Sequence, residues 1–132
     1  MSPRTQFLSR ILGLYCIVAG LCLLLRGRAI ADTVVLLLHD APLVFFVGVV
    51  LLAAGLAMVL AHNLWSGGAL TVVVTLIGWA TAIKGAAFLA VPPAAVADFY
   101  LMDLHYEEHV YLFAAFSLVV GLFLAYGGFK KR

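Results

Sequence analysis

Four long runs of apolar residues, separated by short polar segments, set the organisation of the 132-residue chain. The runs cover about residues 7–25, 42–62, 69–91 and 110–129, and each is close to the roughly 20 apolar residues that cross a bilayer as a helix. A membrane β-barrel would instead show alternating segments of about ten residues, whereas these runs are continuous. The pattern therefore predicts an all-α membrane protein with four transmembrane helices in a single domain, residues 1–132.

The composition supports the same class. Hydrophobic residues make up 66% of the chain and charged residues 11%, whereas an average soluble domain has about 45–50% and about 25%. The net charge is only +2 and no basic stripe is present, which excludes nucleic-acid binding. The apolar runs leave little room for the motifs of soluble enzymes. We therefore expect neither an enzyme nor a cofactor, and the lipid bilayer is the main partner.

Basic residues are divided unequally between the two sides of the predicted membrane domain. Four spans place both termini on one side, which carries five Lys and Arg residues, while the other side carries Arg26 and Arg28. The positive-inside rule assigns the richer side to the cytoplasm. We therefore predict that both termini are cytoplasmic and that all six acidic residues lie on the outer side. The five cytoplasmic residues are Arg4, Arg10, Lys130, Lys131 and Arg132.

Glycines seven residues apart recur along the chain and indicate an internal repeat. A shift of 65 or 66 residues brings residues 1–66 onto residues 67–132, and two spans in each half preserve the direction of the chain. The pattern favours a duplicated two-helix hairpin. Glycine is also frequent in membrane helices, so a coincidence of composition stays open as the alternative.

The paired glycines have a direct physical use in lipid. Residues seven apart lie on one face of a helix, and small residues let two helices approach closely. We therefore expect these glycines to mark faces where helices pack. They are Gly13 and Gly20, Gly48 and Gly55, Gly78 and Gly85, and Gly121 in the matching register of the fourth span.

The two outer linkers, residues 29–40 and 94–107, carry most of the candidate chemistry. They are apolar but too interrupted to span, so we expect them to lie in the interface as amphipathic helices. Each contains an aspartate followed by a histidine seven residues later. These pairs are Asp32 and His39 in the first linker, and Asp98 and His105 in the second.

Imidazole and carboxylate groups in these linkers are ligand types suited to zinc, copper or iron. His105 and His109 have a helical i, i+4 spacing and, with Glu108, spell the H-x-x-E-H string of one metalloprotease class. A protease would need a distal third ligand and a cleft, for which the chain has little material. No metal is our main expectation, with His39, His105 and His109 as the candidates. Ordinary interfacial connectors are the simpler interpretation of both linkers.

Lys84 is the most unusual single residue, because it lies inside the third predicted span. A charge at that depth is costly and is by default a functional hypothesis. Three interpretations stay open: an ion pair with an outer carboxylate, a ligand-binding or proton-carrying role, and a lysine stem that carries its ammonium outward to the interface. The first two predict a carboxylate or a polar cavity beside Lys84.

Two strings of residues resemble those of small, mostly uncharacterised bacterial four-span integral membrane proteins. The strings are L-I-G-W-A-T-A-I-K-G at residues 76–85, followed by Pro92, and L-A-H-N-L-W at residues 60–65. The glycine-paired repeat is also loosely similar to small inner-membrane proteins of the acid-resistance type. The resemblance covers residues 43–92 best. It implies a bacterial inner-membrane location and a non-enzymatic protein, and it transfers no catalytic residue.

Two functions follow from these observations. The first is a bundle that works by packing, as a homo-oligomer or as an accessory subunit of a larger membrane-protein complex. The second is a small transport protein, or one that binds a ligand or ion, using the outer polar residues together with Lys84. Glycine faces left exposed to lipid would favour the first function. An accessible path from the outer face to Lys84 would favour the second.

Overall fold

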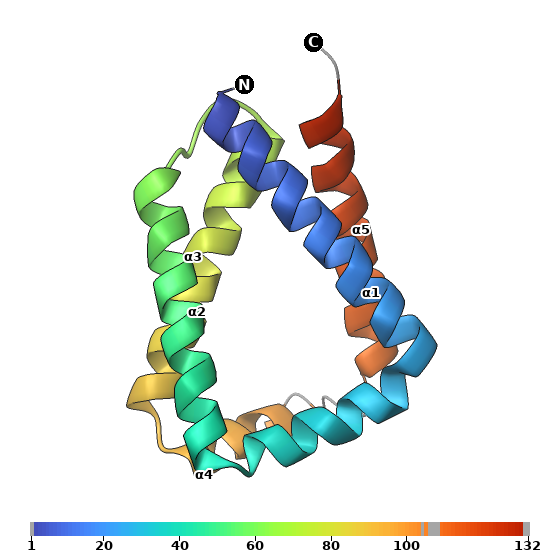
Figure 1. Cartoon of the computed structure of the whole chain (residues 1–132), viewed down its shortest axis with the longest axis vertical. Coiled ribbons are helices and arrows are strands. Elements are labelled where there is room, and N and C mark those ends of the chain that lie inside the picture. Colours follow the sequence, from blue (N-terminus) through green and yellow to red (C-terminus); the bar gives the residue numbers. More distant parts are fainter. Residues whose placement is uncertain (1, 104, 106–108, 131–132) are drawn as a thin grey trace.

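The computed structural model describes residues 2–103, 105 and 109–130, and it confirms an all-α fold (Figure 1). Four of its helices are long and apolar enough to cross a membrane. These helices are α1 (Pro3–Leu38), α2 (Ala41–Ala61), α3 (Ala69–Ala90) and α5 (Val110–Phe129). Between α3 and α5 lie the short helix α4 (Pro93–Asp98) and the π-helical turn η1 (Phe99–Asp103). The observed spans end within one or two residues of the predicted ones, except for α1.

Helix α1 is longer than the predicted first span because it includes the first outer linker. Its 36 residues would extend about 54 Å, which exceeds the roughly 30 Å hydrocarbon core of a bilayer. Arg26 interrupts it with non-helical backbone angles, φ −134° and ψ 33°, and the helix changes direction there (Figure 1). The predicted span 7–25 is therefore the part before the kink, and the linker at 29–40 is helical up to Leu38.

Helices α1 and α5 pack closely along a seam that contains three of the expected glycines. A Cβ atom on Gly13 would lie 2.5 Å from the backbone nitrogen of Ala125, and one on Gly121 would lie 2.8 Å from that of Ile17. Gly20 faces the side chain of Leu118 in the same seam. No side chain larger than hydrogen fits these positions unless the helices move apart.

Helices α2 and α3 form a second seam of the same kind. A Cβ atom on Gly55 would overlap the backbone of Ala82, and one on Gly85 would overlap the backbone of Leu52. Gly48 faces Phe88 and Gly78 faces Met58, and all four glycines are buried. The spans thus pair as α1 with α5 and as α2 with α3.

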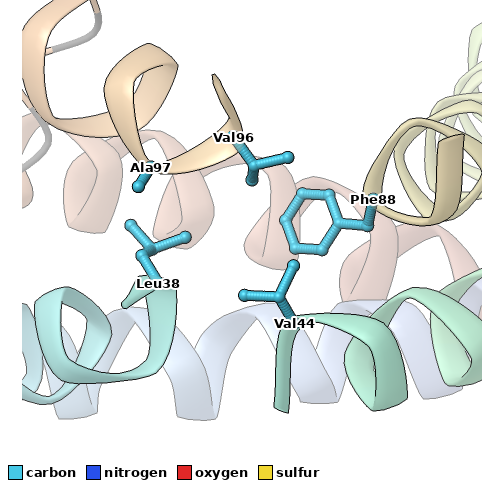
Figure 2. Packing of buried hydrophobic residues seen from close by; sticks show 5 residues of the cluster. All are labelled: Leu38, Val44, Phe88, Val96 and Ala97. Carbon is cyan, nitrogen blue, oxygen red and sulfur yellow. The ribbon is translucent and has the colours of Figure 1, made fainter. Parts of the chain in front are cut away.

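The two helix pairs lie apart along most of their length and meet at their ends (Figure 1). One meeting point is a cluster of buried side chains where α4 folds over the ends of the spans, as Figure 2 shows. Large apolar side chains on the rest of the spans are exposed, as expected for surfaces that face lipid. The cluster consists of Leu38, Val44, Phe88, Val96 and Ala97.

The close approach at Gly85 generates a first prediction. Replacing Gly85 by leucine should lower the free energy of unfolding by about 1–3 kcal/mol or more, because the new side chain overlaps the α2 backbone. The matched control is Ala86→Leu, since Ala86 is the exposed neighbour on the same helix. Denaturant titration in detergent micelles, followed by circular dichroism, measures both variants. Equal stability of the two variants would contradict the role of the seam.

Candidate functional site

Lys84 lies near the C-terminal end of α3, on a face that does not pack against α2. Its side chain is exposed, whereas its neighbour Gly85 is buried in the seam with α2. Lys84 precedes the last residue of the helix, Ala90, by six positions, or about 9 Å at 1.5 Å per residue. The ammonium therefore lies toward the C-terminal end of the helix and not at its midpoint.

Two aromatic rings surround the ammonium of Lys84. Its Nζ atom lies 5.8 Å from the centre of the Phe88 ring and 5.6 Å from that of Tyr100. The two rings meet edge to face, with centres 5.9 Å apart and an angle of 89° between their planes. A cation within about 6 Å of an aromatic face is attracted by the electron-rich face of the ring. These contacts give the ammonium of Lys84 two aromatic neighbours.

A cavity of about 650 Å³, which we call the Lys84 pocket, opens beside this cation. From α3 and the residue that follows it, it is lined by Ala80, Ile83, Lys84, Ala87, Phe88 and Val91. From α4 and η1 it is lined by Ala95, Val96, Phe99 and Tyr100. Its walls are almost entirely apolar, and its size is within the roughly 300–1,000 Å³ typical of small-molecule sites.

The carboxylate partner expected for Lys84 is not present among the side chains that the structure describes, which do not include that of Asp103. Neither Asp32 nor Asp98 forms an ion pair with it, and its only described partners are the two rings. Glu107 and Glu108 lie outside the described residues. The cavity beside Lys84 is apolar, so the expected polar cavity is not found there either.

The outer histidines and aspartates do not converge in the part of the chain that the structure covers. His39 and His109 are exposed, and the Nδ1 atom of each contacts a backbone oxygen one turn earlier, of Val35 at 2.8 Å and of His105 at 3.1 Å. The rings of His105 and His109 lie 6.4 Å apart. Within the described residues, no three His, Cys, Asp or Glu side chains are grouped closely enough to hold a metal ion.

His62 is a functional candidate that the sequence analysis missed. It is 3% exposed, and it joins three elements at the end of the molecule opposite α4. Its Nε2 atom lies 2.8 Å from the hydroxyl of Thr5 on α1, and its Nδ1 atom lies 3.0 Å from the hydroxyl of Thr75 on α3. Both ring nitrogens of a buried histidine are therefore satisfied by hydroxyl groups.

The hydrogen bonds around His62 continue on both sides. Thr75 donates to the carbonyl oxygen of Leu64 at 2.7 Å, so His62 Nδ1 is the donor to Thr75. Nε2 lies 2.8 Å from the hydroxyl oxygen of Thr5, which in turn lies 2.8 Å from that of Ser2. A cavity of about 450 Å³ lies beside this chain, lined in part by Ser2, Arg4 and His62.

Sequence reasoning missed His62 because one histidine at the end of a span gives no periodic signal. Its partners, Thr5 and Thr75, lie 57 and 13 residues away along the chain. The site therefore depends on tertiary pairing, which spacing alone does not reveal.

Comparisons with models of known protein families, with curated proteins and with solved structures find no match for this chain.

The burial of His62 generates a second prediction. His62→Ala should lower the free energy of unfolding by about 1–3 kcal/mol, because it removes two buried hydrogen bonds that tie the end of α2 to α1 and α3. His39→Ala removes an exposed histidine and is the matched control, for which we expect a change within about 0.5 kcal/mol. Thermal and denaturant unfolding in detergent measure both. If His62→Ala is as stable as the control, the hydrogen-bonded chain does not hold the helix ends together.

Proposed function

We propose that this chain is a non-enzymatic integral membrane protein that binds a ligand in the Lys84 pocket. The observation that carries the proposal is an ammonium with no carboxylate partner among the described residues, at the edge of an apolar cavity. An apolar cavity with one well-placed charge is the usual form of a small-molecule site. The ligand that fits both features is an amphiphile, with an apolar part for the walls and a polar part for Lys84.

The packing of the glycines favours this function over a bundle that works only by association. All seven glycines are buried against a neighbouring helix of the same chain. They are consequently not available as a glycine face for a second molecule. Lys84, in contrast, is exposed and reaches a cavity that opens from the molecule.

A homo-oligomer or an accessory subunit of a larger membrane complex is the second candidate function. Its support is the separation of the two helix pairs, which leaves apolar side chains exposed on the spans (Figure 1). Examples are Leu14 and Val18 on α1 and Phe116 on α5. Lipid or a second protein would cover such surfaces equally well, so this function has no site of its own.

We further propose a bacterial inner-membrane location with both termini in the cytoplasm. The two termini lie at the same end of the molecule (Figure 1). The end with the termini carries five basic residues in the sequence, and the end with α4 carries two, Arg26 and Arg28. This imbalance supports the orientation through the positive-inside rule. In this orientation, the Lys84 pocket lies near the outer surface.

A duplication of a two-span unit is also part of the proposal, and matching contacts support it. Gly20 faces Leu118 in one seam, and Gly85 faces Leu52 in the other. In this pair, Gly85 lies 65 residues after Gly20, and Leu52 lies 66 residues before Leu118. The same two offsets relate Gly13 to Gly78 and Ala125 to Val59. Gly13 contacts Ala125, and Gly78 contacts Val59. Equivalent contacts in both seams are expected of two halves related by rotation about the membrane normal.

Accessibility of single cysteines tests the orientation. In a variant whose Cys16 and Cys22 are replaced by alanine, we introduce Ser2→Cys or Asp98→Cys, both at exposed positions. A membrane-impermeant maleimide should label Asp98→Cys in intact spheroplasts and should label Ser2→Cys only after lysis. The reverse pattern would overturn the assignment of cytoplasmic termini.

Photo-crosslinking tests ligand binding in the pocket. Nanodiscs are prepared with a phospholipid that carries a diazirine in its acyl chain, and labelled peptides are identified by mass spectrometry. We expect labelling concentrated on residues 80–100, and about a tenfold loss in Ala87→Phe, equivalent to about 1.4 kcal/mol of binding. The matched control is Ala86→Phe, whose exposed position lies outside the pocket. Uniform labelling of all spans, or an equal loss in both variants, would contradict the proposal.

A further inference from the structure

Resting on the proposed function, we infer that the ligand is an anionic glycerophospholipid of the outer leaflet. Its phosphate lies at Nζ of Lys84, and one acyl chain lies in the Lys84 pocket along α3. Charge, shape and depth in the membrane each support this identification.

The charge argument starts from the unmet bonding capacity of Lys84. A lysine ammonium has three N–H donors, and in the described part of the chain its contacts are the faces of Phe88 and Tyr100. The rings attract the positive charge but accept no conventional hydrogen bond. Asp98 on α4 is exposed and is not part of the pocket wall, so its carboxylate does not compete with an anionic ligand. A phosphate oxygen supplies both the missing acceptor and the missing negative charge.

The shape argument concerns the residues that flank Lys84 on its own face of α3. Ala80 and Ala87 are one turn away on either side, and Val91 follows one turn after Ala87. Small alanine side chains beside a long lysine leave a furrow that runs along the helix, and α4 and η1 cover its outer end through Ala95 and Phe99. The furrow has the direction and the apolar walls that an acyl chain needs.

The apolar walls also exclude a free inorganic anion as the occupant. A phosphate ion that entered this cavity would lose water and gain one cationic side chain in return. Removing polar groups from water without replacing their hydrogen bonds costs several kcal/mol. A lipid avoids this cost, because its acyl chain occupies the apolar part while its phosphate stays at the hydrated edge.

The depth of Lys84 matches the level that a lipid phosphate can reach. The residue lies about 9 Å inside the end of α3, and a lysine stem extends its ammonium toward the head groups. Aromatic residues such as Phe99 and Tyr100 are typical of this interfacial level. The phosphate and the ammonium can therefore meet just below the membrane surface, beside η1.

Native mass spectrometry of the whole protein tests this identification. The protein is released from nanodiscs that contain equal amounts of phosphatidylglycerol and phosphatidylcholine with identical acyl chains, and the retained lipids are counted. We expect the wild-type protein to retain phosphatidylglycerol about tenfold more than phosphatidylcholine. This factor is what one charge-assisted hydrogen bond between Lys84 and the anionic lipid would contribute. Lys84→Met should remove this preference while lipid is still retained, and Lys84→Arg should keep most of it.

Two control variants separate this inference from the proposed function. Arg28→Met removes an exposed charge near the same end of the molecule but outside the pocket, and it should leave the preference unchanged. Ala87→Phe should reduce retention of both lipids. If Ala87→Phe loses lipid but the wild-type protein shows no preference, the inference fails and the proposed function stands. If Ala87→Phe retains as much lipid as wild type, the proposed function fails as well.

Competition identifies the source of the phosphate. Added inorganic phosphate at millimolar concentration should not displace phosphatidylglycerol, because it gains nothing from the apolar walls. Displacement by inorganic phosphate, or equal retention of a single-chain fatty acid in place of the phospholipid, would overturn the assignment to a glycerophospholipid. Melting temperatures of all variants, measured alongside, show that each protein compared is folded.

Discussion

Close approach of helix backbones is the constraint on which this fold depends. Helices in a bilayer gain nothing by hiding apolar side chains from one another, because the lipid tails are equally apolar. Their association depends on dispersion contacts, which are weak individually and fall off steeply when a gap opens. At Gly55 and Gly85 the α2 and α3 backbones are so close that a single added carbon would overlap the neighbouring helix. The seams therefore supply most of the cohesion within each pair.

The ends of the helix pairs are held by different interactions from the seams. Where α4 covers the spans, buried apolar side chains such as Leu38, Val44 and Phe88 pack together (Figure 2). At the opposite end, His62 bridges hydroxyl groups from α1 and α3. Backbone and side-chain polar groups at such depths have little water available and must be satisfied internally. The molecule is thus two glycine-packed pairs joined by an apolar contact at one end and a polar contact at the other.

The spans were predictable because a helix that crosses lipid needs a fixed number of apolar residues. Two of these runs end at polar residues 62–63 and at prolines 92–93, and the observed ends of α2 and α3 lie next to them. The burial of Gly13 or Gly78 on a contact face also follows from their spacing. The continuation of α1 beyond Arg26 was not predictable, because two arginines after an apolar run are the usual pattern of a span's end. In the structure, the helix resumes after a single residue with non-helical angles, Arg26.

The partner of each helix could not be predicted from the same spacing. A glycine pair defines a face but not the helix that packs against it, so α1 could have paired with α2 as well as with α5. The neighbours of Lys84 are likewise determined by tertiary packing and not by sequence spacing. The aromatic ring of Tyr100 reaches the ammonium only because the chain folds back over α3 after Val91. A carboxylate was the simplest expected partner, and the two rings serve the same electrostatic purpose at lower desolvation cost.

The proposed repeat makes the location of the pocket informative. Under the 65-residue offset, Ala80, Lys84 and Ala87 correspond to Tyr15, Ala19 and Cys22. The first half therefore has larger side chains where the second half has space, and no charge where the second half has Lys84. The chain also continues as a helix after α1's kink, whereas Pro92 and Pro93 break it after α3 and let α4 cover the furrow. Packing positions are matched between the halves because both seams need them. The cavity, the ammonium of Lys84 and the covering helix α4 occur together only in the second half. This is expected if the second half of a repeated scaffold carries the proposed binding site.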